Sequence, residues 1–375
     1  LLPLMVQAFS CLVAWVISLI SSKMRNKNII TMVVSLLFLA AYFYLYSKMG
    51  DIISGLIANG TAIAVAFKKY AFPAYYFGVG IAEHNLTYLL LYTVCTLAVF
   101  ELVYAILSRS FRQITTAKKG TARIKYKERS MHVSSPAAAL LRKDFWHFIG
   151  NPMYVLNAWM GEILLVVACA AMLIKKDILT EFLPILNGEG EIMGLILCVI
   201  LCGLSCTNLI TAPSISLEGK NLWIAQSIPV PAGVVLRAKV KLQMLLCIPI
   251  TALSALLMGI VLKLELLTLV LAVLVPAAFN LFTALLGVVV NLHFPKFDYI
   301  NETVVIKQSM STMICMFGSM AVVLVLALLY ALLLSAVSPS AYLIVCLVLL
   351  SVADICMWNY LAHGGSARFA ALQAD

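Results

Sequence analysis

The sequence has 375 residues, of which 63% are hydrophobic and only 11% are charged, and its formal net charge is +10. An ordinary soluble domain carries about 25% charged residues, and one core cannot bury this much apolar side-chain surface. The composition therefore excludes a soluble protein. It predicts an all-α, polytopic helical bundle whose remaining apolar surface faces lipid.

Nine segments are long and apolar enough to cross a bilayer, since a span needs about 20 apolar residues. In chain order they are residues 1–22, 28–47, 84–108, 155–174, 192–212, 242–262, 266–290, 310–336 and 341–362. We expect residues 1–375 to form a single transmembrane domain. Because Leu1 already lies inside an apolar run, we also expect upstream helices to be missing from this chain.

Residues 52–67 are apolar but short, contain Gly55 and Gly60, and end at Lys68–Lys69. A tenth span here would upset the alternation of charge in the loops that follow. We therefore expect an external interfacial or re-entrant segment, because runs of this length are usually not spans.

The basic residues are unevenly divided between the two sides of the predicted bundle. Alternate loops hold 20 of the 26 lysines and arginines, namely residues 21–28, 108–153, 213–241, 291–312 and 363–375. Cytoplasmic loops carry the excess of Lys and Arg. This pattern places these loops and the C-terminus in the cytoplasm.

Residues 108–143 hold ten basic side chains and one acid, Glu128, which is typical of a solvated loop near anionic lipid. The segment has too few aromatic residues for a nucleic-acid interface, so we expect no nucleic-acid partner. Residues 141–151 mix charges with aromatic rings. They predict an amphipathic elbow helix on the inner leaflet, which Pro152 ends before the next span.

No catalytic motif is present in the sequence. The patterns GxxxxGK[ST], HExxH and GxSxG are absent, and the five histidines are scattered. The ten cysteines all lie in apolar stretches, and Cys198, Cys202 and Cys206 share one helix face. We expect these thiols to be buried apolar groups rather than metal ligands or disulfides.

Three carboxylates fall inside predicted spans: Glu101, Glu162 and Asp354. An ionised carboxylate in hydrocarbon is costly, so such residues face a bundle interior or a wet cavity. They are candidates for a translocation path or a proton relay. The alternative is a position near the membrane boundary, where each carboxylate is partly solvated. The asparagines of the predicted spans, Asn157, Asn208, Asn280 and Asn359, are expected to bond between helices rather than to bind substrate.

The connector over residues 211–241 is the most informative cytoplasmic loop. Ser214 or Ser216 can cap a short helix that has Glu218 in its first turn and Trp223 on an apolar side. Pro229 ends this helix. The pattern predicts a short amphipathic helix held just below the membrane, and its simplest role is an interfacial anchor.

This connector resembles the cytoplasmic segment of bacterial type-2 ATP-binding-cassette exporter permeases, particularly an exporter group common in Gram-positive bacteria. That segment reads approximately Ser-x-Ser-x-Glu-Gly-Lys, then Trp, then a Leu/Ile–Pro pair and a Lys. The matching residues are Ser214, Ser216, Glu218, Gly219, Lys220, Trp223, Ile228, Pro229 and Lys239. Residues 138–155 are similar to the elbow helix of that family, and the layout matches over residues 85–375.

The resemblance implies the membrane subunit of an ATP-driven exporter in the bacterial cytoplasmic membrane. It implies that the chain is not itself an enzyme and binds no cofactor directly. ATP and Mg would belong to a separate nucleotide-binding subunit, and a second permease copy or homologue would complete the complex. The implied ATPase contacts are Ser214, Ser216, Glu218, Gly219, Lys220, Trp223, Pro229, Arg142, Asp144 and Trp146.

The substrate class stays open between a peptide, a drug and a lipid. Two other functions also stay open at this point. One is a proton-driven secondary transporter that uses the three carboxylates, and the other is a membrane enzyme acting on lipids.

Overall fold

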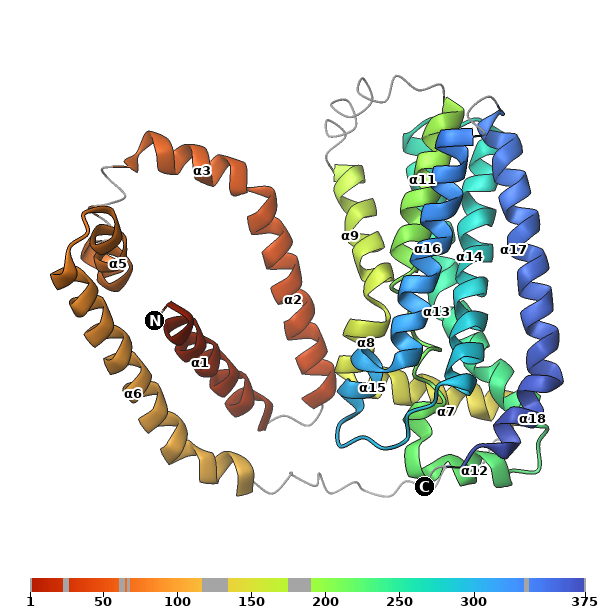
Figure 1. The fold of residues 1–375 in the computed structure, drawn as a ribbon, viewed down its shortest axis with the longest axis horizontal. Helices are drawn as coiled ribbons and strands as arrows, with labels where there is room; N and C mark the ends of the chain where they lie inside the picture. The colour runs from red at the N-terminus through yellow and green to blue at the C-terminus, as the bar shows by residue number, and fades with distance from the viewer. Residues whose placement is uncertain are drawn as a thin grey trace. The chain divides into compact units, whose positions relative to one another are not determined.

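The computed structural model describes residues 2–22, 27–60, 65, 68–116, 134–174, 190–333 and 337–373. Every regular element within these ranges is a helix, and their only extended pairing is an isolated bridge between Trp159 and Asn208. The all-α prediction is confirmed for this part of the chain. The chain divides into two compact units, Leu1–Ser130 and Met131–Asp375 (Figure 1).

The first unit is built from apolar helices joined in sequence. They are α1 (Leu2–Ser22), α2 (Lys27–Ser47), α3 (Met49–Ala58), α5 (Phe72–Ala82) and α6 (Leu86–Thr116). Helix α6 packs against α1 and α5. Helix α3 leaves α2 at a bend of 51°, so residues 52–58 do not continue the preceding helix in a straight line. Residues 61–64, 66 and 67 of the predicted interfacial segment lie outside the described ranges.

The second unit is a bundle of longer helices with short helices at one end. Its elements are α7 (Pro136–Gly150), α8 (Pro152–Ala158), α9 (Met160–Ile174), α11 (Gly190–Ser205), η1 (Ser216–Asn221), α12 (Leu222–Ser227), α13 (Ala232–Val261), α14 (Leu266–His293), α15 (Glu302–Gln308), α16 (Met310–Leu333), α17 (Pro339–Ala362) and α18 (Gly364–Ala371). Helix α14 packs against α11, α13, α16 and α17. The core between them includes Leu201, Ala272 and Phe279, all buried.

Five helices in the described residues are long and apolar enough to cross a membrane, and the bent pair α2–α3 could supply a sixth. Three further apolar helices, which lie in α1, α9 and α11, are shorter than a full span. Each of the nine predicted spans falls on a helix, but only five or six have the length and composition of a span. The last residues of the predicted span 310–336 lie outside the described ranges.

Two predicted spans are interrupted. Residues 155–174 are divided between α8 and α9 at Trp159, and the helix predicted over residues 192–212 ends at Ser205. The two breaks face each other, because the Leu209 N–H donates to the Ala158 carbonyl at 2.8 Å. Gly161 allows this approach, since a Cβ atom there would lie 2.2 Å from the Leu204 carbonyl oxygen.

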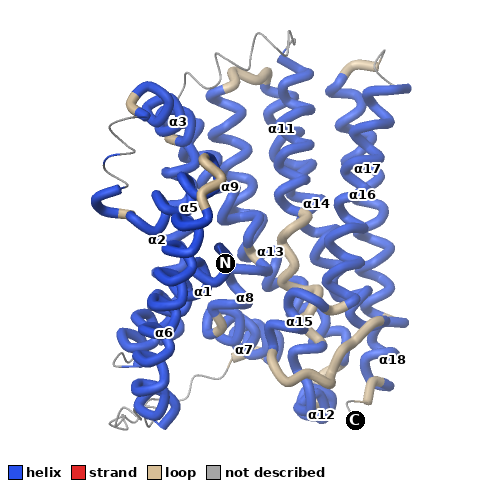
Figure 2. Tube along the Cα trace, turned by 60° about the vertical axis from the view of Figure 1, so that its left-hand side comes forward, coloured by secondary structure: helices blue, strands red, loops and turns tan. Residues whose placement is uncertain are grey.

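Helices α7, α12, α15 and α18 gather at one end of the second unit, as both views show (Figures 1 and 2). Side-chain caps start two neighbouring helices in this region: Ser135 caps α7, and Asn151 caps α8. One aromatic ring of the amphipathic helix α7, that of Phe148, faces the bundle. This ring is buried and packs edge-to-face against Tyr154 and Trp159.

Candidate functional site

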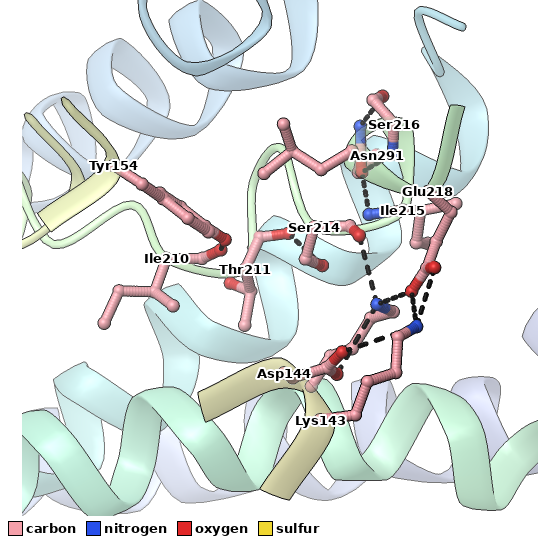
Figure 3. A network of polar contacts seen from close by, with 12 residues as sticks. Lys143, Asp144, Tyr154, Ile210, Thr211, Ser214, Ile215, Ser216, Glu218 and Asn291 are labelled. Carbon is pink, nitrogen blue, oxygen red and sulfur yellow. Dashed lines mark hydrogen bonds and ion pairs between the residues drawn. The ribbon is translucent and has the colours of Figure 1, made fainter. Parts of the chain in front are cut away.

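The connector between α11 and α13 runs from Cys206 to Pro231 and folds back against the bundle. It has little regular structure, since only η1 and the single short helix α12 interrupt it. Its backbone polar groups must therefore find partners outside a helix. Side chains from α7, α8, α13 and α14 hold the connector at three points, and those of α8, α13 and α14 bond to its backbone (Figure 3).

The first point is a cluster of four charged side chains, of which Glu218 is the central one. The Glu218 carboxylate accepts from Lys143 of α7 at 2.7 Å and from Lys239 of α13 at 2.8 Å. Asp144 of α7 lies 3.5 Å from the Lys239 ammonium group. Lys239 also donates to the Ser214 carbonyl at 3.0 Å. The cluster thus joins the connector to the elbow helix α7 and to the long helix α13 with two positive and two negative groups.

The charges of this cluster are buried to different degrees and depend on one another. The Lys239 side chain is 3% exposed and that of Glu218 is 11% exposed, whereas Lys143 is half exposed. Burial by itself would raise the pKa of the Glu218 carboxyl, but the ammonium groups of Lys239 and Lys143 lower it to about 2. Glu218 is therefore ionised at neutral pH and serves as the counter-ion of a buried lysine.

The second point is an asparagine clamp from α14. The Asn291 Oδ1 atom accepts from the backbone N–H groups of Ile215 and Ser216, at 2.8 and 3.1 Å. Its Nδ2 group donates to the Ser216 hydroxyl at 2.8 Å and to the Ser311 hydroxyl at 3.0 Å. Asn291 therefore has both ends of its amide satisfied and fixes the start of η1 on the bundle.

The third point holds the first residues of the connector. Gln243 of α13 accepts from the Thr211 N–H at 3.0 Å and donates to the Asn208 carbonyl at 3.0 Å. The Tyr154 hydroxyl of α8 donates to the Ile210 carbonyl. Backbone groups that left α11 at its early end are satisfied by these side chains.

Gly219 occupies a backbone conformation that other residues avoid, with φ of +53° and ψ of −137°. It breaks the helical path inside η1, ahead of α12. A Cβ atom at this position would lie 2.9 Å from the Tyr299 hydroxyl, which itself donates to the Leu217 carbonyl at 3.3 Å. Only glycine fits both the dihedral angles and the space.

Helix α12 presents apolar side chains outward. Trp223 is 64% exposed and Ile224 is 46% exposed, while Leu222 and Ala225, on either side of them in the sequence, are buried. Gln226 donates to the carbonyls of Phe369 and Leu372, so the C-terminal segment holds α12 from its other side. An exposed tryptophan on a fixed helix is typical of a contact surface.

A groove of about 460 Å³ runs beside α12. One wall is formed by α12 and the residues at its two ends, namely Asn221, Ile224, Ala225 and Ile228. Helix α7 contributes Lys143 and His147 to the groove. Glu218 and Glu302 also line it. The groove combines apolar side chains with charged groups at its margin.

The predicted contact residues divide into two groups. Arg142, Trp146, Lys220, Trp223 and Pro229 are exposed. Ser214, Ser216, Glu218, Gly219 and Asp144 are buried or half-buried and hold the connector in place. The structure brings Glu218 and Asp144 into one cluster. The proposed capping role of the serines is wrong, because Ser214 donates to the Thr211 carbonyl and Ser216 bonds to Asn291.

The three carboxylates of the predicted spans are divided between the two units. Glu101 lies on α6 of the first unit and is exposed, whereas Glu162 of α9 and Asp354 of α17 are buried in the second. Glu162 accepts from Asn208 and Thr251. Asn280 donates to Thr251 of α13, so the prediction of bonds to other helices is confirmed for Asn208 and Asn280. It is wrong for Asn157, whose amide donates to the Met153 carbonyl of its own helix.

Sequence reasoning missed Gln243, Asn291, Tyr299 and Thr251 as partners. A weak signal was available for the two amides, since a buried Gln or Asn in an apolar helix needs a hydrogen-bonding partner. Which backbone they bind is not encoded locally, because Asn291 lies 75 residues after Ser216.

The sequence lacks a GxxxxGK[ST] loop. Among the described residues Gly219 is the one glycine with positive φ, and its neighbour is the Tyr299 ring rather than an open cradle. A group of three or more His, Cys, Asp or Glu side chains able to hold a metal ion is also absent from the described ranges.

Comparison with known proteins gives one match. A family model described as "Putative ATP-binding cassette" matches residues 22–353, which is most of the chain. Neither the curated proteins nor the solved structures contain a significant match.

Proposed function

Since the chain belongs to the family described as putative ATP-binding cassette, we propose that it is the membrane-spanning subunit of an ATP-driven exporter. The apolar helices of spanning length support a place in a membrane. In this proposal the chain moves its substrate out of the cell, and a separate nucleotide-binding subunit binds ATP and Mg. A second permease copy or homologue completes the complex in the bacterial cytoplasmic membrane.

The observation that carries the proposal is the clamped connector with its exposed helix. Trp223 and Ile224 offer an apolar contact to a partner on the surface, and the buried charges behind them join the connector to α7 and α13. A push on α12 would therefore reach a helix of spanning length. ATP can shift the conformational equilibrium only through contacts that differ between two states, and the exposed face of α12 is where we place those contacts.

The test is co-purification of the full chain with a candidate nucleotide-binding subunit, followed by measurement of substrate-stimulated ATP hydrolysis. The Trp223→Ala variant should insert and fold normally but lose the stimulation, because its side chain is exposed and its removal leaves no cavity. As a matched control, Phe317→Ala removes an exposed aromatic ring of α16 that is not among the proposed contact residues. Normal stimulation and transport in Trp223→Ala would count against the proposed contact.

A further inference from the structure

The two interrupted helices meet around one buried carboxylate. Glu162 lies in the first turn of α9, directly after the break at Trp159, and it is 1% exposed. The break after α11 lies opposite, where Asn208 pairs with Trp159 in the isolated bridge. Interrupted helices at membrane depth are tolerated where they line a cavity or bind an ion, because their free backbone groups need partners.

The hydrogen bonds around Glu162 come from four parts of the bundle. Its Oε1 atom accepts from Asn208 at 2.9 Å and from Thr251 of α13 at 2.8 Å. Asn280 of α14 then donates to Thr251 at 3.0 Å and to Ser205 of α11 at 3.1 Å. The network therefore holds one oxygen of the carboxyl group in a fixed position.

The other oxygen is different. Glu162 Oε2 is buried and has no hydrogen-bond partner, and the same is true of Trp159 Nε1 in the adjacent break. Among the ion pairs of the described residues, none involves Glu162. Cys247 of α13 is the titratable side chain that faces Glu162. The groups that α11 and α14 contribute to the network are the Ser205 hydroxyl and the Asn280 amide.

An ionised carboxylate buried without a cation is costly, and adding a proton removes that cost. The donors around Oε1 disfavour a metal ion, since N–H and O–H groups point toward the carboxyl oxygen. We propose that the paired helix breaks form an intramembrane proton-binding site, in which Glu162 Oε2 carries an exchangeable proton. This inference does not depend on an ATPase partner.

Carbodiimide labelling of the wild-type chain in detergent tests the site without any substitution. Dicyclohexylcarbodiimide adds to protonated carboxyl groups in apolar surroundings, and peptide mass spectrometry identifies the modified residue. We expect an adduct on Glu162 that declines as the buffer is made alkaline, with Asp298, exposed in the loop between α14 and α15, as the internal comparison. An adduct that is absent from Glu162 at every pH would overturn the proposal.

Infrared difference spectra between acidic and alkaline buffers give the second measurement. We expect a carboxylic-acid C=O band that is lost in alkali, shifts in D₂O, disappears in Glu162→Gln and moves in Glu162→Asp. A band that persists in alkali would show a proton that is not released. The absence of any band would show a permanent carboxylate. Dependence on Na⁺ rather than pH would assign a metal ion instead. Each of these three results contradicts the proposal.

Discussion

The energetics of the connector centre on Lys239, a buried cation whose charge is balanced by Glu218 and Asp144. Removing one partner of a buried ion pair typically costs about 3–5 kcal/mol, because the remaining charge stays buried without compensation. We therefore expect Glu218→Gln to lower the free energy of unfolding by about 3 kcal/mol. Thermal unfolding of the detergent-solubilised protein measures this change.

Lys143 is the matched control for that experiment. It bonds to the same carboxylate but is half exposed, and pairs of that kind contribute at most about 1 kcal/mol. Lys143→Ala should therefore lower the unfolding temperature much less than Glu218→Gln does. Equal effects of the two substitutions would mean that the burial of Lys239 does not matter.

The lowered pKa of Glu218 predicts the pH dependence of the same contribution. A carboxyl group whose folded pKa of about 2 lies below its ordinary value of 4.5 stabilises the folded state above that ordinary value. The contribution is lost as the pH falls from 4.5 through about 2. The difference in unfolding temperature between wild type and Glu218→Gln should shrink over this window. A difference that grows on acidification would refute the assignment.

At the scale of elements, the connector is held by side chains rather than by its own helix. Asn291→Leu removes the acceptor for two buried N–H groups, each of which then costs about 1–3 kcal/mol. We expect faster hydrogen–deuterium exchange at Ile215 and Ser216, with little change in α13. Unchanged exchange in the connector would show that Asn291 is not its anchor.

The kink inside η1, ahead of α12, depends on Gly219. A residue with a Cβ atom at φ of +53° and ψ of −137° is strained by about 1–3 kcal/mol, and Tyr299 blocks the space as well. Gly219→Ala should therefore speed exchange in α12 and increase proteolysis of the connector. The double variant with Tyr299→Ala should recover only the part of the loss that is due to crowding.

Hydropathy predicted where most helices lie but not where they break. The breaks at Trp159 and Asn208 fall inside apolar runs. A hydropathy pattern reports only how favourable it is to move each side chain from water into an apolar phase. What permits the breaks is tertiary, namely the bond from Leu209 N–H to the Ala158 carbonyl and the amide of Gln243. Contacts across 35 or more residues leave no local signature.

At the scale of the whole molecule, the apolar composition was sufficient to predict an all-α bundle, and the residues of the connector were sufficient to single it out. Glu218 and Lys239 were both recognised as parts of a motif, but their ion pair was not, since they stand 21 positions apart in the sequence. The number of spans could not be read from apolar length alone. Within the described residues, two of the predicted spans correspond to helices shorter than a bilayer requires, namely α9 with 15 residues and α11 with 16.

The central claim is that α12 lies on the cytoplasmic side, where an ATPase can reach it. The direct measurement is labelling of Trp223→Cys in intact cells with a membrane-impermeant maleimide, compared with the unsubstituted chain as background. Glu265→Cys, in the exposed loop between α13 and α14, is the control for the opposite side. The account predicts that Cys at position 265 is labelled in intact cells and that Cys at position 223 is labelled only after permeabilisation. Labelling at position 223 in intact cells would contradict it.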